Sequence, residues 1–93
     1  MTADNVAQLV AEAKTPEEHE ALATYFRGEA AANAAKVKQH EAMIASYKKT
    51  GGRPYQLWKQ HCDTLIHSYR QAQQENEKLA AEHEKLAKEA KAN

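Results

Sequence analysis

The sequence contains few of the residues that sheets, tight turns and disulfide frameworks require. Its 93 residues include one cysteine, two prolines, three glycines and only 6% aromatic residues. One cysteine excludes an internal disulfide, and the low glycine, proline and aromatic content argues against a β-rich domain. No apolar run is long enough to span a bilayer, so we expect no membrane insertion.

The chain also lacks net charge. Thirteen basic and thirteen acidic residues cancel, so no field attracts nucleic acid or an anionic membrane, and we expect neither as a partner. Residues 1–93 suffice for a single small domain, near the lower limit for a chain that builds its own core. Alanine, glutamate, lysine and glutamine are abundant instead, which is the composition of long helices.

Local start and stop signals predict an all-α fold. Thr15 can cap a helix that begins at Pro16, with Glu18 completing a capping box, and Gly51-Gly52 supplies a left-handed stop. The predicted elements are a short helix at about 4–14, a long helix at about 16–50, a turn at 51–53 and a long helix at about 54–90. The short connection makes the long helices antiparallel neighbours, that is, a helical hairpin.

Residues at steps of three and four mark one face of each long helix. In the first long helix this face holds His19, Leu22, Phe26, Ala30, Asn33, Val37, His40, Ile44 and Tyr47. In the second it holds Trp58, Cys62, Leu65, Tyr69, Ala72, Asn76, Leu79, His83 and Leu86. Many of these residues are small or polar, so one hairpin buries little and needs further support. We therefore predict a homodimer, in which two hairpins pair into a four-helix bundle and the short helix packs across one end.

Centring the hairpin on the glycine turn sets His40 opposite Cys62. Met43 shares a helix face with His40, and His61 flanks Cys62, so these four residues are the predicted metal site. Two imidazoles, a thiolate and a weak thioether form a cupredoxin-like ligand set, although the fold is not that of a cupredoxin. Copper is the expected metal. Zinc gains little from a thioether, and haem bound through His, Cys or Met is a further alternative. Whether the ligands come from one chain or two stays open.

The same register sets His19 opposite His83, and each histidine lies among glutamates. This pair is a weaker second candidate for a zinc or copper site, and in a dimer an intersubunit site is one option for it. Solvated or capping histidines at the end of a bundle are the blander interpretation.

A metal ion buried in a bundle, with no open coordination position, favours electron transfer or copper carriage and sequestration over catalysis. Either role would require a redox or copper-exchange partner protein. The alternative is a structural or interaction module without metal, a hairpin that dimerises or docks on a partner helix. An enzyme is the third interpretation, since Cys62 could pair with His40 or His61 as nucleophile and base. A hairpin seam offers neither a cleft nor an oxyanion hole, so we expect no enzymatic activity.

Several segments form a pattern that covers most of the chain after its first ten residues. They are residues 11–23 with Tyr25, His40-Glu41-Ala42-Met43, Tyr47, the glycine turn, His61-Cys62, and Glu-Asn-Glu-Lys-Leu-Ala at 75–80. This pattern resembles a group of small exported proteobacterial helical-bundle proteins, most of them uncharacterised. The resemblance implies an exported, periplasmic bundle from which a signal peptide has been removed, and it implies no settled activity. The residues by themselves leave a cytoplasmic location open.

Overall fold

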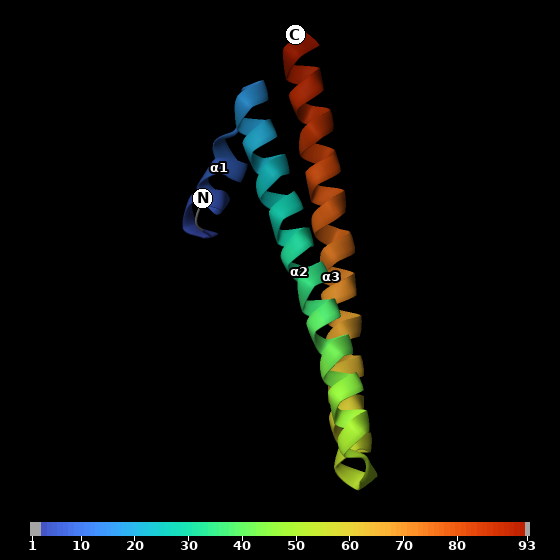
Figure 1. The fold of residues 1–93 in the computed structure, drawn as a ribbon. Helices are drawn as coiled ribbons and strands as arrows, with labels where there is room; N and C mark the ends of the chain where they lie inside the picture. The colour runs from blue at the N-terminus through green and yellow to red at the C-terminus, as the bar shows by residue number, and fades with distance from the viewer. Residues whose placement is uncertain (1–2, 93) are drawn as a thin grey trace.

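Two long antiparallel helices and one short helix make up the protein. The computed structural model describes residues 3–92, and within that range the order is α1 (Ala3–Glu12), α2 (Pro16–Thr50) and α3 (Gly52–Ala92), with no strand. Helices α2 and α3 lie side by side along their length, joined at one end by the glycine turn (Figure 1). The result is a thin rod, with principal extents of 62 × 23 × 14 Å. The predicted all-α class and the hairpin arrangement are therefore confirmed.

The start of α2 is fixed by the predicted capping box. The Thr15 hydroxyl accepts a hydrogen bond from the Glu18 N–H at 3.1 Å, and the Glu18 carboxylate accepts one from the Thr15 N–H at 3.0 Å. The same carboxylate also accepts from the N–H of Lys14 at 3.0 Å. Because Lys14 is thus held by the cap of α2, α1 ends at Glu12, two residues before the predicted end.

The turn between the long helices is shorter than the sequence predicted. Gly51 and Gly52 have φ values of 72° and 77°, the left-handed region that favours glycine. The Gly51 N–H donates to the Tyr47 carbonyl at 3.1 Å and closes the last turn of α2. Helix α3 then begins at Gly52, so Gly51 alone separates the two helices.

The face of α3 that packs on α2 differs from the predicted one at alternate positions. Ile66, Ala80 and Ala87 are buried together with the predicted Cys62, whereas the predicted Trp58, Leu65, Leu79 and Leu86 keep 38–41% of their surface exposed. Tyr69, Asn76 and His83, which both patterns share, are half-buried. The prediction was wrong because it gave the large apolar residues to the seam. The structure instead sets the residue after each leucine against α2, namely Ile66 after Leu65, Ala80 after Leu79 and Ala87 after Leu86.

On α2 the predicted face is confirmed, and the packing there explains the preference for small residues. All nine predicted residues are buried or half-buried, and Ala23 is buried with them. Ala23 and Ala30 on α2, with Ala80 and Ala87 on α3, are at most 4% exposed. Small side chains let two helix backbones approach closely, and a leucine at these positions would hold them apart.

One edge of the hairpin is lined by ion pairs between the helices. Arg27 pairs with Glu84, Glu41 with Arg70 at 3.4 Å, and Glu20 with Lys91 at 2.8 Å. The α2 members lie one or two heptads apart, and so do their α3 partners. Each pair is largely exposed, so it contributes little stability, but their equal spacing shows that α3 keeps the same register on α2 along this edge.

Helix α1 contacts α2 and makes no contact with α3. It folds back beside the first part of α2, on the side away from α3 (Figure 1). Val6 and Leu9 are half-buried, while Val10 stays 50% exposed. None of the helices in residues 3–92 carries an apolar stretch sufficient to cross a lipid bilayer.

Candidate functional site

The four predicted copper ligands lie at different depths in the hairpin. Cys62 is a free thiol, 5% exposed, and His40 and Met43 are half-buried. His61 is exposed. Successive residues of a helix are about 100° apart around its axis, so a seam position for Cys62 turns His61 toward solvent.

His40 itself contacts Tyr69. The two rings stack with centroids 5.5 Å apart and planes 24° apart. Tyr69 lies one heptad beyond Cys62 on α3. The Nδ1 atom of His40 is buried and has no hydrogen-bond partner in the structure, which makes it an unsatisfied polar atom inside the seam.

The described part of the chain, residues 3–92, contains no group of three or more His, Cys, Asp or Glu side chains that could hold a metal ion. His40, His61 and Cys62 are therefore not assembled as a ligand set within one chain. A copper site at these residues stays a prediction that requires a second chain or a local rearrangement.

The weaker second pair of the sequence prediction does come together. His19 of α2 and His83 of α3 place their Nδ1 atoms 3.2 Å apart. Their ring centroids are 5.4 Å apart and their planes 23° apart. The centroid separation exceeds the nitrogen separation by close to one ring diameter. The two nitrogens therefore lie nearly on the line between the ring centres and face each other head on.

The surroundings of His83 favour the neutral imidazole. Burial lowers the pKa of His83 below its ordinary value, the neighbouring His19 lowers it further, and Glu82 raises it to a smaller extent. Phe26 also packs against His83, with centroids 5.7 Å apart and planes 13° apart. Two half-buried imidazoles thus meet at the open end of the hairpin, opposite the turn.

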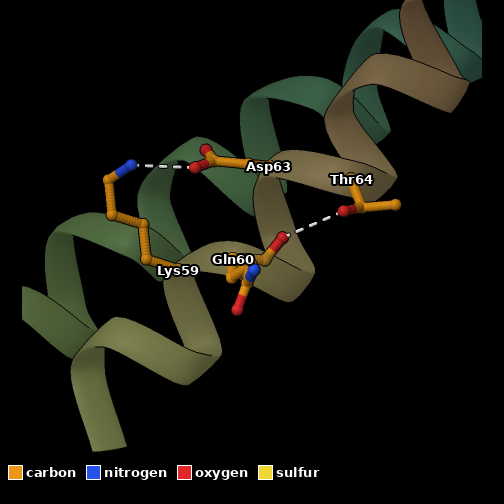
Figure 2. A network of polar contacts seen from close by, with 4 residues as sticks. All are labelled: Lys59, Gln60, Asp63 and Thr64. Atoms are coloured by element: carbon orange, nitrogen blue, oxygen red, sulfur yellow. Dashed lines mark hydrogen bonds and ion pairs between the residues drawn. The ribbon is translucent and has the colours of Figure 1, made fainter. Parts of the chain in front are cut away.

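At the turn end, aromatic packing closes the hairpin. Tyr47 of α2 packs on Trp58 of α3 with ring centroids 4.8 Å apart. Along the outer side of α3, Lys59 pairs with Asp63 at 2.8 Å, and the Thr64 hydroxyl donates to the Gln60 carbonyl at 3.1 Å (Figure 2). These contacts join residues four apart on one helix, so they stabilise α3 and create no site between helices.

The main feature that the sequence prediction missed is an exposed apolar stripe on the side of α3. We call it the flanking stripe, and it consists of Trp58, Leu65, Leu79 and Leu86. Its members lie one or two heptads apart, and each is about two-fifths exposed. A shallow hollow over the first turns of α3 continues the stripe, lined in part by Pro54, Leu57 and Trp58. The signal was present in the sequence, but it was read as the face that packs on α2.

Comparisons with known proteins identify no relative. No family model matches the chain, and neither a curated protein nor a solved structure matches it. The resemblance to exported proteobacterial bundles therefore stays an expectation from the sequence. Any function has to be argued from the geometry of the hairpin.

Proposed function

We propose that the protein is a helical-hairpin interaction module that pairs with a second copy of itself through the flanking stripe. The observation that carries this proposal is the heptad spacing of Trp58, Leu65, Leu79 and Leu86, each about two-fifths exposed. Helix α3 thus has a wide apolar face, in which only one part contacts α2. Such a three-in-seven face is typical of helices that pack on two neighbours in a bundle.

The small core of the single hairpin supports this proposal. Leu22 is the one large side chain of the described residues that is fully buried, and the other deeply buried residues include four alanines. A single core of this size rarely stabilises a domain without association, metal or disulfides. Pairing along the flanking stripe would bury large apolar side chains, which contribute about 1.5–3 kcal/mol each when they pass from full exposure to full burial.

A second copy fits the stripe better than an unrelated partner for two reasons. From Trp58 to Leu86 the stripe extends about 42 Å along α3 at 1.5 Å per residue, which is about two-thirds of the 62 Å length of the hairpin. The equal numbers of acidic and basic residues also mean that two copies carry no net charge that would oppose their association. The paired hairpins would form the four-helix bundle expected from the sequence.

Leu79→Lys tests the proposal by placing a charge in the middle of the stripe. Ala81→Lys is the matched control, because Ala81 is exposed on α3 outside the stripe. We expect the native protein and the control to have the mass of a dimer in sedimentation equilibrium, and Leu79→Lys to have that of a folded monomer. A monomeric native protein at all concentrations would contradict self-association and direct the search to a partner helix of another protein.

A copper site at His40, Met43, His61 and Cys62 is the second candidate. It is favoured by one observation, the buried His40 Nδ1 atom that lacks a partner, since a metal ion would satisfy it. His61 is exposed, so the ligand set is completed by a second chain or by movement of the first turns of α3. In this role the bundle would transfer electrons, or carry and sequester copper, for an exchange partner protein in the periplasm. Zinc or haem at the same residues is less compatible with the four donors.

Addition of Cu(II) to the purified protein tests the second candidate. A thiolate-bound Cu(II) would give intense visible absorption, whereas a carriage site would hold colourless Cu(I), loaded in the presence of an added reductant and detected by metal analysis. Cys62→Ala is the control that should lose the stoichiometric copper. Equal binding by the native protein and by Cys62→Ala would remove this candidate and leave the interaction module unaffected.

A further inference from the structure

The strongest unexplained arrangement in the hairpin is the contact between His19 and His83. These residues come from the first turns of α2 and the last turns of α3, and their Nδ1 atoms are 3.2 Å apart. The contact joins residues separated by 64 positions in the chain. It therefore connects the start of α2 with the last turns of α3 at the open end of the hairpin.

Packing keeps the two rings next to each other. Phe26 stacks on His83, and Ala23, Ala80 and Ala87 are buried in the same part of the seam. The charged groups at this end are largely engaged with each other. Arg27 pairs with Glu84, and Lys91 pairs with Glu20, while Glu18 is held in the capping box of α2. Arg27 and Lys91 therefore keep their ion-pair partners while the two imidazoles stay where they are.

We propose that His19 and His83 form a two-imidazole clasp that binds a borderline divalent transition-metal ion, with Zn²⁺ as the reference ion. Imidazole nitrogens are preferred ligands for such ions. Two nitrogens bound to one tetrahedral Zn²⁺ at 2.0–2.1 Å are about 3.3 Å apart. The Nδ1 atoms of the pair already have nearly this separation, 3.2 Å. A rotation of the rings then directs both lone pairs at one ion without displacing the helices.

The number of protons on the two imidazoles does not have to change when the ion binds. In the metal-free neutral pair one Nδ1 carries the proton and the other accepts it. When the ion binds, that proton moves to Nε2 of the same ring, so both imidazoles remain neutral. The neutral form of each imidazole is the one that binds metal. Water or a solvent anion fills the remaining coordination positions.

The clasp goes beyond the proposed interaction module, because it acts within one chain and at residues outside the flanking stripe. Metal binding to the folded hairpin, and not to the unfolded chain, raises the melting temperature. It would fasten the open end of α2 to α3, where no covalent connection exists.

Titration with ZnCl₂ tests the clasp, by calorimetry for stoichiometry and by circular dichroism for the melting temperature. We expect one Zn²⁺ per chain and a melting temperature that rises with Zn²⁺ concentration. His19→Gln and His83→Gln should each lose at least about tenfold in affinity, which is 1.4 kcal/mol. His67→Gln is the matched control, because His67 is exposed on α3, and it should bind as the native protein does.

Three results would overturn the clasp. The first is the absence of Zn²⁺ binding in the folded native protein. The second is unchanged affinity in His19→Gln and His83→Gln, with circular dichroism confirming that both variants are helical. The third is binding that persists in those variants and disappears in Cys62→Ala, which would assign the ion to the other candidate site. Sedimentation in the absence of metal reports self-association separately, so failure of the clasp and failure of the interaction module are distinguishable.

Discussion

Trp58 packs its ring on Tyr47 with centroids 4.8 Å apart, yet it retains 38% of its surface exposed as the first residue of the flanking stripe. One side of the indole thus closes the hairpin near the turn, and the other side faces outward. Trp58 is the single tryptophan of the chain. Its fluorescence therefore reports directly on whether the stripe becomes covered.

The emission of Trp58 should depend on protein concentration. If two copies pair along the flanking stripe, the indole leaves water and its emission maximum shifts to shorter wavelength as the concentration rises. Steady-state fluorescence over a dilution series measures this shift. Leu79→Lys should keep the emission of the dilute native protein at every concentration, whereas a shift in that variant would mean that another surface covers Trp58.

Replacing Ala80 with leucine should destabilise the hairpin. Ala80 is 2% exposed in the seam, so three additional carbons must force the helices apart, which lowers the free energy of unfolding by about 1–3 kcal/mol. Urea denaturation followed by circular dichroism measures the change. Ala81→Leu is the control, because Ala81 is exposed one position along α3, and it should change the free energy of unfolding by less than about 0.5 kcal/mol.

The Ala80 and Leu79 positions also show how far the sequence determines the fold. Helix type, the capping box at Thr15 and the glycine turn depend on local chemistry, and all were predictable. The choice between Leu79 and Ala80 as the residue that packs on α2 depends on how closely two helices approach. Leu79 and Ala80 are each three or four residues from both Asn76 and His83, which belong to the predicted face and to the observed one. Helical periodicity alone therefore does not decide which of the two packs on α2.

The two candidate sites also differ in how far the sequence predicted their contacts. His19 and His83 lie on the shared positions of both patterns, so their contact was predictable from the register. His40 was expected opposite Cys62, and in the structure its ring stacks on Tyr69, one heptad farther along α3. A heptad is about 10.5 Å along a helix, so both rings lean along the helix axis to meet, and a rule that pairs facing residues by position omits this.

The two glycines of α2 and its cap should respond oppositely to alanine. Gly28 is exposed inside α2, and nothing lies within 4 Å of an added Cβ, so Gly28→Ala should raise the free energy of unfolding by about 0.5–1 kcal/mol. Gly51 has φ 72° and ψ −176°, a region that is essentially restricted to glycine. Gly51→Ala should therefore lower the free energy of unfolding by about 1–3 kcal/mol. Urea denaturation measures the change in the free energy of unfolding for both variants. If Gly51→Ala changes it in the same direction as Gly28→Ala, the backbone at Gly51 relaxes and stores no strain.

The capping box makes the start of α2 sensitive to acid. The N–H of Lys14, then the N–H and the hydroxyl of Thr15, lower the pKa of Glu18 below its ordinary value of 4.5. The ionised carboxylate is therefore favoured in the folded state. Its contribution is present above pH 4.5 and is lost as the pH falls through the lowered pKa of the folded state.

We expect the melting temperature of the native protein to fall in that acidic range by more than that of Glu18→Gln. Glutamine keeps a hydrogen-bond acceptor at the cap and does not titrate, so the difference between the two proteins isolates the carboxylate. Thermal unfolding followed by circular dichroism measures it. Parallel pH profiles for the two proteins would show that the capping carboxylate makes no pH-dependent contribution.

Replacing His40 with phenylalanine should leave the metal-free protein as stable as before or more stable. The ring stack on Tyr69 is preserved in this variant, and the buried Nδ1 atom without a partner is removed. Such an unsatisfied atom costs about 1–3 kcal/mol, so the free energy of unfolding should rise by up to that amount. His67→Phe, at an exposed position of α3, is the control for introducing an aromatic residue.

The same variant separates the two roles proposed for this part of the seam. If His40 serves only packing, His40→Phe keeps the oligomeric state and gains stability in urea denaturation. If His40 also binds copper, the gain is seen only without metal, and the variant loses the stoichiometric copper that the native protein holds. A drop in the stability of the metal-free variant would contradict both, because it would mean that Nδ1 has a stabilising partner in the folded protein.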